Sequence, residues 1–224
     1  MIFATSLVAC CSFVTAATLG TYEFTGTSTA DGQFNAVTAQ PTGASFSTFT
    51  RTNVNWTSTA NLFNSTAWNV AVTVDTAEYV QFSFTVDTGY TATLSSLSYF
   101  QQGSNTVNDE YRVAYSTNSF ATTAGFIDDT VAISPGSSET YNFGSVVLTA
   151  GQSISFRFYV FGDTQADGVG VPSAAGTFRF DTISLDGSIV SAVPEPSAYA
   201  MMAGGLALAS VLVHRRRRAA VKAA

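Results

Sequence analysis

Carboxylates are the candidates for acid–base chemistry in the main body of this sequence. The one histidine, His214, lies near the C-terminus, so the residues before it can form neither a Ser-His-Asp triad nor a histidine metal site. Glycoside hydrolysis needs two carboxyl groups roughly 5 to 10 Å apart, and four pairs lie close in sequence: Asp75 with Glu78, Asp109 with Glu110, Asp128 with Asp129, and Asp163 with Asp167. None lies in a glycosidase motif. We therefore expect solvated loop acids and predict that the protein is not an enzyme.

Oxygen-bearing side chains alternate in a segment bounded by Gly162 and Gly170. Asp163, Gln165 and Asp167 could supply the oxygen ligands that calcium prefers, although the segment lacks the closing glutamate of an EF-hand loop. We keep these three residues as weak calcium candidates and predict no other metal and no cofactor. Four aromatic residues could stack on sugar rings, and we expect most of them to pack in the core instead: Trp56, Trp68, Tyr90 and Tyr99.

The body that must position these residues has the composition of a β protein. Between positions 18 and 193, Thr, Ser, Val, Phe and Tyr are plentiful and lysine is absent, and β-branched and aromatic residues favour strands. Apolar residues alternate with polar ones in Val80–Val86 and Ile154–Val160, the period of two that places one face of a strand in a core. Tyr111–Tyr115 and Phe178–Phe180 follow the same pattern.

Weaker patterns raise the expected number of strands to about ten, in Tyr22–Thr27, Ser45–Thr50, Trp68–Val74, Thr91–Phe100, Thr130–Ile133 and Tyr141–Leu148. The apolar parity shifts by one at Ser95 and Ser96 and again between Phe180 and Ile183, and a β-bulge would absorb each shift. Turn residues separate the strands, and we expect turns at Asp87–Gly89, Ser134–Gly136, Thr149–Gly151 and Asp186–Gly187. Short antiparallel strands predict an all-β fold, a two-sheet antiparallel β-sandwich of jelly-roll type over residues 18–192.

The body is acidic and contains no thiol. It has four arginines and 14 acidic residues, a formal net charge of −10, so we expect no nucleic-acid partner. The only two cysteines, Cys10 and Cys11, lie in the N-terminal apolar segment. The body can therefore form no disulfide, and its stability must come from a hydrophobic core.

Residues 2–17 form an uncharged apolar segment that ends in small residues, which is typical of a secretory signal peptide. We therefore predict a signal peptide over residues 1–17. The segment lacks a basic N-terminal region, so we expect either an atypical signal or a start upstream of Met1. Leu7–Cys10 also resembles a bacterial lipobox, in which Cys10 would carry a lipid.

The C-terminal segment has an apolar run followed by a cluster of positive charge. Ala198–Val213 is uncharged and, as a helix, would extend roughly 24 Å against a hydrocarbon core of about 30 Å. Four consecutive arginines follow it, and arginines beside a membrane span stay in the cytoplasm: Arg215, Arg216, Arg217 and Arg218. We predict a short transmembrane helix with these arginines as its stop-transfer signal and the body outside. A buried core helix is the alternative.

Val193, Pro194, Glu195 and Pro196 precede the apolar run, and with it and the arginines they resemble a PEP-CTERM sorting signal. The prolines keep this stretch extended, because each fixes its own φ and biases the preceding residue away from helix. The resemblance implies that the tripeptide is recognised by exosortase, a membrane-embedded transpeptidase, and that the tail is removed during export. We assign this sorting signal to residues 193–224.

These features and the resemblance predict an exported protein of structural or binding type, anchored transiently in the membrane by its C-terminus. We expect delivery to the cell envelope or the extracellular matrix. The expected partner is an exosortase-like enzyme, with exopolysaccharide or another glycan as a further candidate. The alternative is a carbohydrate-binding or carbohydrate-cleaving β-sandwich module.

Overall fold

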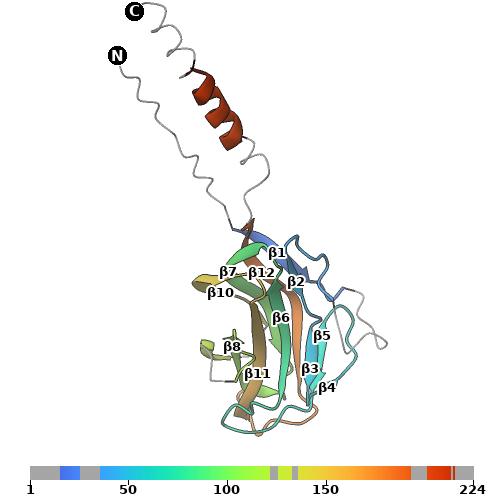
Figure 1. Cartoon of the computed structure of the whole chain (residues 1–224). Coiled ribbons are helices and arrows are strands. Elements are labelled where there is room, and N and C mark those ends of the chain that lie inside the picture. Colours follow the sequence, from blue (N-terminus) through green and yellow to red (C-terminus); the bar gives the residue numbers. More distant parts are fainter. Residues whose placement is uncertain are drawn as a thin grey trace, which may run out of the picture. The chain divides into compact units, whose positions relative to one another are not determined.

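The computed structural model describes residues 16–25, 36–121, 126–132, 136–192, 201–212 and 214, of which 126–132 are described by their backbone. The chain divides into two units, Met1–Val190 and Ser191–Ala224. The first unit contains the β-structure (Figure 1) and the second a helix over residues 201–212. Most of the predicted signal peptide, the motif Val193–Pro196 and the arginines Arg215–Arg218 lie outside the described residues.

Six strands form the first antiparallel sheet, in the order β10, β7, β12, β5, β4, with β1 paired to β12. The bounds are β1 Ala17–Tyr22, β4 Asn55–Trp56, β5 Phe63–Thr66, β7 Tyr90–Gly103, β10 Ser137–Leu148 and β12 Thr177–Ser191. One edge of β12 pairs with β5 through residues 177–180 and with β1 through residues 183–187. Because β7 pairs with β12 as well, the last strand lies inside its sheet.

Six further strands form the second antiparallel sheet, in the order β2, β6, β11, β8, β9, with β3 paired to β6. The bounds are β2 Ala44–Phe46, β3 Thr50–Thr52, β6 Tyr79–Val86, β8 Asn108–Ser116, β9 Phe126–Ala132 and β11 Ser153–Gln165. The register of the central pair places Phe156 of β11 opposite Phe82 of β6. Two antiparallel sheets confirm the predicted mostly-β class and are compatible with a β-sandwich.

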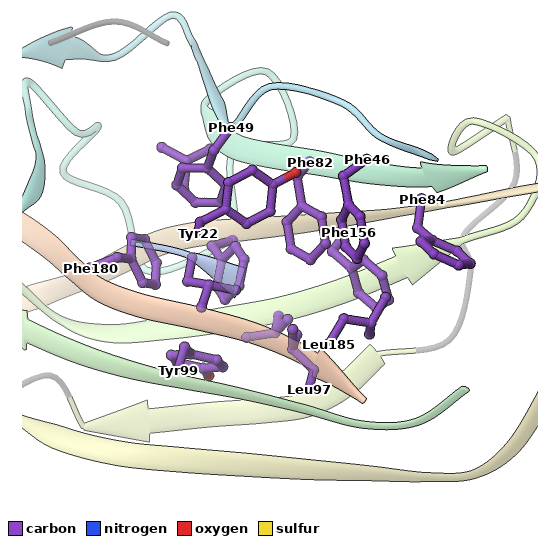
Figure 2. Close-up of a cluster of buried hydrophobic side chains, with 14 of the residues drawn as sticks. Tyr22, Phe46, Phe49, Phe82, Phe84, Leu97, Tyr99, Phe156, Phe180 and Leu185 are labelled. Carbon is purple, nitrogen blue, oxygen red and sulfur yellow. The ribbon is translucent and has the colours of Figure 1, made fainter. Parts of the chain in front are cut away.

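The core is a layer of aromatic and aliphatic side chains between the two sheets. β6 alternates strictly, with every second side chain buried, as its sequence predicts. The rings of Phe82 and Phe156 stack with centroids 4.9 Å apart. The ring centroids of Phe158 in the second sheet and Phe180 in the first lie 4.6 Å apart. Figure 2 shows Leu185 of the first sheet in the same cluster. Side chains of both sheets therefore form one continuous core.

Arg51 links the two sheets through polar contacts. From β3 in the second sheet, its Nε donates to Ser65 Oγ and its Nη2 donates to the carbonyl oxygen of Asn64, each at 2.8 Å, on β5 of the first sheet. The guanidinium carbon lies 3.5 Å from the centroid of the Phe63 ring. Burial lowers the pKa of Arg51 to about 9, so the side chain remains charged at neutral pH.

The predicted strand Trp68–Val74 is wrong. Ala67 has a φ of 64°, which ends the extended chain of β5, and the segment that follows is a loop with one isolated bridge between Ala71 and Gly162. Trp68 is buried, 3% exposed, with its Nε1 donating to Ser65 O at 3.3 Å, whereas Val70 and Val72 are 38% and 65% exposed. The apolar alternation of this segment therefore does not correspond to one buried strand face.

The predicted turn at Asp186–Gly187 is also wrong, because β12 continues through it. A Cβ on Gly187 would lie 2.4 Å from the carbonyl oxygen of Thr93, so this glycine serves the close approach of β7 rather than a turn. The turns before Tyr90 and before Gln152 are confirmed, with Gly89 and Gly151 at φ of 84° and 77°. Most of the turn predicted at Ser134–Gly136 lies outside the described residues.

In the second unit, residues 201–212 are helical and exposed. A helix of this length rises about 18 Å. No helix within the described ranges has both the length and the apolar character that a membrane span requires. The described helix thus covers only part of the segment Ala198–Val213 predicted from the sequence.

Truncation of a central core ring should destabilise the protein strongly. Phe82 and Phe156 are 1% and 0% exposed, so Phe82→Ala or Phe156→Ala should lower the free energy of unfolding by about 3 to 5 kcal/mol. Ser155→Ala, on the opposite face of β11, is the matched control and should change it by less than about 0.5 kcal/mol. Chemical denaturation measures all three. A loss below about 1 kcal/mol for the ring variants would show that the strand faces are assigned wrongly.

Candidate functional site

A hollow of about 220 Å³ opens on the first sheet, over β7, β10 and β12. Ser98 and Phe100 alternate with buried residues of β7, so their side chains point away from the core. The residues around the hollow are Ser98, Tyr99, Phe100, Ser138, Glu139, Thr140, Thr182 and Ser184. Sequence analysis missed this place because its residues come from three strands that are far apart in the chain.

Thr182, beside the hollow, has an unusual backbone conformation. Its φ is 47°, in the left-handed region that β-branched residues rarely adopt. Phe180 and Ile183 are both buried, so Asp181 and Thr182 form a bulge between them. The parity shift in the sequence predicted this bulge, and the structure confirms it. It was the one sequence signal that pointed to the hollow.

Hydroxyl groups form hydrogen bonds between strands across the outer surface of this sheet. The hydroxyls of Ser98 and Thr140 lie 3.0 Å apart, which links β7 to β10 at the hollow. The hydroxyls of Thr21 and Ser184 are also 3.0 Å apart, which links β1 to β12. Each hydroxyl can donate one hydrogen bond and accept two. The surface therefore retains donors and acceptors for a polar ligand.

The first predicted acid pair, Asp75 with Glu78, holds a loop in place. Glu78 Oε2 accepts a hydrogen bond from the backbone N–H of Asn69 at 2.6 Å, and Asp75 Oδ2 accepts one from Asn69 Nδ2 at 3.2 Å. Asp75 Oδ1 also accepts from the backbone N–H of Ala77. Burial raises the pKa of Glu78, the hydrogen bond from Asn69 opposes this, and the charge of Asp75 adds to the increase.

The structure brings Asp109, Glu110 and Asp163 together, which sequence analysis had divided between two pairs. Burial raises the pKa of Glu110, and the negative charges of Asp109 and Asp163 raise it further, while Arg112 opposes them. Asp109 Oδ1 is buried and, within the described part of the chain, accepts no hydrogen bond. The side chains of the remaining pair, Asp128 with Asp129, lie outside what the structure describes.

The calcium candidates lie at the end of β11 and in the loop after it. Gln165 Nε2 donates to the carbonyl oxygen of Val171 at 2.8 Å, and Asp167 Oδ1 accepts from the backbone N–H of Val169 at 2.9 Å. Both side chains thus shape their own loop. Across the described residues, no three His, Cys, Asp or Glu side chains are grouped to hold a metal ion. Calcium binding through Asp163, Gln165 and Asp167 stays a prediction.

Two of the four aromatic residues considered as sugar platforms belong to the core. Trp68 is 3% exposed and packs against Phe178, and Tyr99 is 2% exposed and donates or accepts a hydrogen bond with Tyr111 at 2.9 Å. Trp56 and Tyr90 are half-buried. Phe100, which sequence analysis did not consider, is the aromatic residue at the hollow whose side chain points outward.

β12 ends at Ser191, and the family described as PEP-CTERM protein-sorting motif matches residues 192–218. The C-terminal segment is a PEP-CTERM sorting motif. This motif implies that the chain is exported and is recognised by an exosortase. The resemblance of Val193–Pro196 and the arginine cluster to such a signal is thereby confirmed.

Comparison with other proteins gives only distant likenesses for the body that precedes the PEP-CTERM motif. No curated protein matches the chain. A family 29 carbohydrate-binding module has 11% identity and a TM-score of 0.38, over 83% of this chain and 98% of that one. A family 35 carbohydrate-binding module from Clostridium thermocellum has 9% identity and a TM-score of 0.27, over 77% and 98%.

A cleaved adhesin domain of Lys-gingipain from Porphyromonas gingivalis has 11% identity and a TM-score of 0.31, over 57% of this chain and 74% of that one. Likenesses as distant as these three say nothing of what the present chain binds. The assignment that the comparisons support therefore concerns the PEP-CTERM motif.

Replacement of Glu78 should change how stability depends on pH. The pKa of Glu78 is higher in the folded protein than in the unfolded chain, so the stability it contributes is complete below the unfolded pKa and is lost as the pH rises through the folded pKa. Glu78→Gln keeps an acceptor for Asn69 but stays uncharged. Its free energy of unfolding should therefore increase relative to that of the wild type as the pH rises from 4 to 7, so the variant gains relative stability.

The exposed Glu23 offers the matched control, because Glu23→Gln changes the same chemical group on an open surface. Denaturation curves at several pH values would measure all three proteins. If the difference between Glu78→Gln and the wild type did not change with pH, the electrostatic account of this loop would be wrong.

Proposed function

We propose that this protein is an exported β-sandwich of jelly-roll type, with a structural or binding role at the cell envelope or in the extracellular matrix. One observation carries the proposal: the PEP-CTERM motif begins at residue 192, directly after β12 ends at Ser191. The strand that precedes the motif pairs with neighbours on both of its edges. The sheets of the body are therefore formed without the tail. We infer that the body is the exported part of the protein and that the tail is its sorting signal.

We propose that the tail anchors the chain in the membrane transiently. We infer that Ala198–Val213 lies in the membrane as a helix before processing and that Arg215–Arg218 keep its end in the cytoplasm. A charged residue at the membrane centre costs roughly 2.5 to 3.5 kcal/mol on insertion scales, so four arginines oppose translocation strongly. An exosortase-like enzyme would then act at Pro194–Pro196, and the body would be released outside.

Three of the described acid groups, Asp75, Glu78 and Asp167, hold loops in place, which favours a role other than catalysis for these three. Asp75 and Glu78 both bind Asn69, and Asp167 binds the backbone of its own loop. Carboxylates used in this way fix loops at the end of the sheets. Between the two carbohydrate functions considered from the sequence, this favours binding over cleavage, and the hydroxyl-lined hollow on the first sheet favours it further.

The processed protein should lack its tail. The motif, the apolar run and the arginines occur together in the order that sorting requires, so intact-mass measurement of protein from the cell envelope or medium should give a chain that ends near Pro194–Pro196. Replacement of Pro194, Glu195 and Pro196 by alanine should leave the tail attached.

Ser197→Ala, next to the tripeptide, is the control and should be processed normally. Recovery of wild-type protein through Ala224 from extracellular material would contradict the proposed sorting. Recovery of the triple-alanine variant alone with its tail attached, in the membrane fraction, would support it.

A further inference from the structure

We propose that the hollow on the outer face of the first sheet binds one ring of a neutral carbohydrate. The inference deepens the binding role proposed above and rests on it, because a matrix or envelope offers polysaccharide as a ligand. Five hydroxyl-bearing residues and one outward-pointing phenyl ring surround the hollow, and they come from β7, β10 and β12: Ser98, Phe100, Ser138, Thr140, Thr182 and Ser184.

The chemistry of these side chains matches that of a sugar. Serine and threonine hydroxyls donate and accept hydrogen bonds, as sugar hydroxyls do, so either partner can take either role. Phe100 supplies an apolar face beside the hydroxyls, which suits the C–H groups of a pyranose ring. Ligand sites typically combine an apolar or aromatic surface with a few polar groups that fix orientation.

The size and charge of the hollow restrict the ligand further. Its volume of about 220 Å³ is smaller than the roughly 300 Å³ at which drug-sized pockets begin, so the hollow suits a single sugar ring. Among the described residues around it there is no lysine or arginine, and the carboxylate of Glu139 accepts a hydrogen bond from Ser137 on the opposite face of β10. A sulfated or uronic-acid unit would meet no positive charge there, so a neutral sugar fits better.

The site is built on strands and is formed before any ligand binds. Thr182 is held with a φ of 47° in a bulge of β12, and strained backbone of this kind persists where the surrounding structure fixes it, often at functional sites. The ring of Phe100 lies close to Gly136, since a Cβ at Gly136 would be 2.8 Å from Phe100 Cζ. Groups held by strands are positioned more precisely than groups on loops.

The experiment is a binding measurement on the purified full-length protein in detergent. The probes are an array of neutral oligosaccharides based on glucose, mannose, xylose and N-acetylglucosamine, with sulfated and uronic-acid oligosaccharides on the same surface. The wild type should bind at least one neutral probe saturably and should bind the anionic probes more weakly. Absence of saturable binding to every neutral probe, or preference for the anionic ones, would overturn the proposal.

Two substitutions locate the binding. Phe100→Leu keeps an apolar side chain but removes the ring, and Thr140→Val keeps the shape but removes the hydroxyl; each should weaken binding about tenfold or more. Thr93→Val removes a hydroxyl from β7 outside the hollow and should leave the affinity unchanged. Gly136→Ala should also weaken binding, because the added Cβ displaces the ring of Phe100.

Equal unfolding midpoints for the variants show that each one is folded. Wild-type affinity in folded Phe100→Leu and Thr140→Val would overturn the proposal, because it would place the sugar elsewhere. Failure of this inference and failure of the proposed function are distinguishable, since processing and export of the same variants are read by intact mass. A protein that is sorted normally but binds no sugar would leave the structural role standing.

Discussion

The structure depends on the burial of aromatic rings between two sheets that no disulfide cross-links. The only cysteines are Cys10 and Cys11, at the N-terminus. Phe49 shows how the rings replace cross-links: its centroid lies within 6.2 Å of Phe82 and Phe158 in the second sheet, and within 5.8 Å of Phe63 and Phe180 in the first. Each large apolar side chain contributes about 1.5 to 3 kcal/mol when fully buried, and Arg51 adds polar contacts between the same sheets.

An aromatic inner layer leaves the outer faces to small polar side chains. On β7, β10 and β12 these are mostly serine and threonine, whose hydroxyls bond to one another across strands. The bulge at Thr182 interrupts this regular surface. The same alternation that builds the core thus produces a hydroxyl-rich exterior, and the irregularity of one strand accompanies the hollow in it.

Local periodicity in the sequence was enough to predict the main strands. Alternation identified β6 and most of β11, and the shift between Phe180 and Ile183 identified the bulge of β12. Prediction failed where tertiary contacts set the local structure. Trp68 was predicted to lie in a strand, but it belongs to a loop that places its side chain in the core. Gly187 was predicted to form a turn, but it allows the close approach of β7 instead.

The candidate binding site could not be predicted in the same way. Ser98, Thr140 and Ser184 become neighbours only through the order of strands in the first sheet, and no local pattern in the sequence encodes that order. The sorting motif is the opposite case. It is a continuous segment whose chemistry depends on its own residues, so the sequence alone was sufficient to identify it.

The central claim is that the body and its sorting signal are separable, because β12 completes its sheet before the motif begins at residue 192. Fusion of residues 192–224 to an unrelated exported domain tests it most directly, with cell fractionation and intact mass as the readouts. We predict that the fusion reaches the envelope or medium without its tail, and that it keeps the tail when Pro194, Glu195 and Pro196 are replaced by alanine. A folded fusion that is neither sorted nor cut would contradict the account, because the body would then be part of the signal.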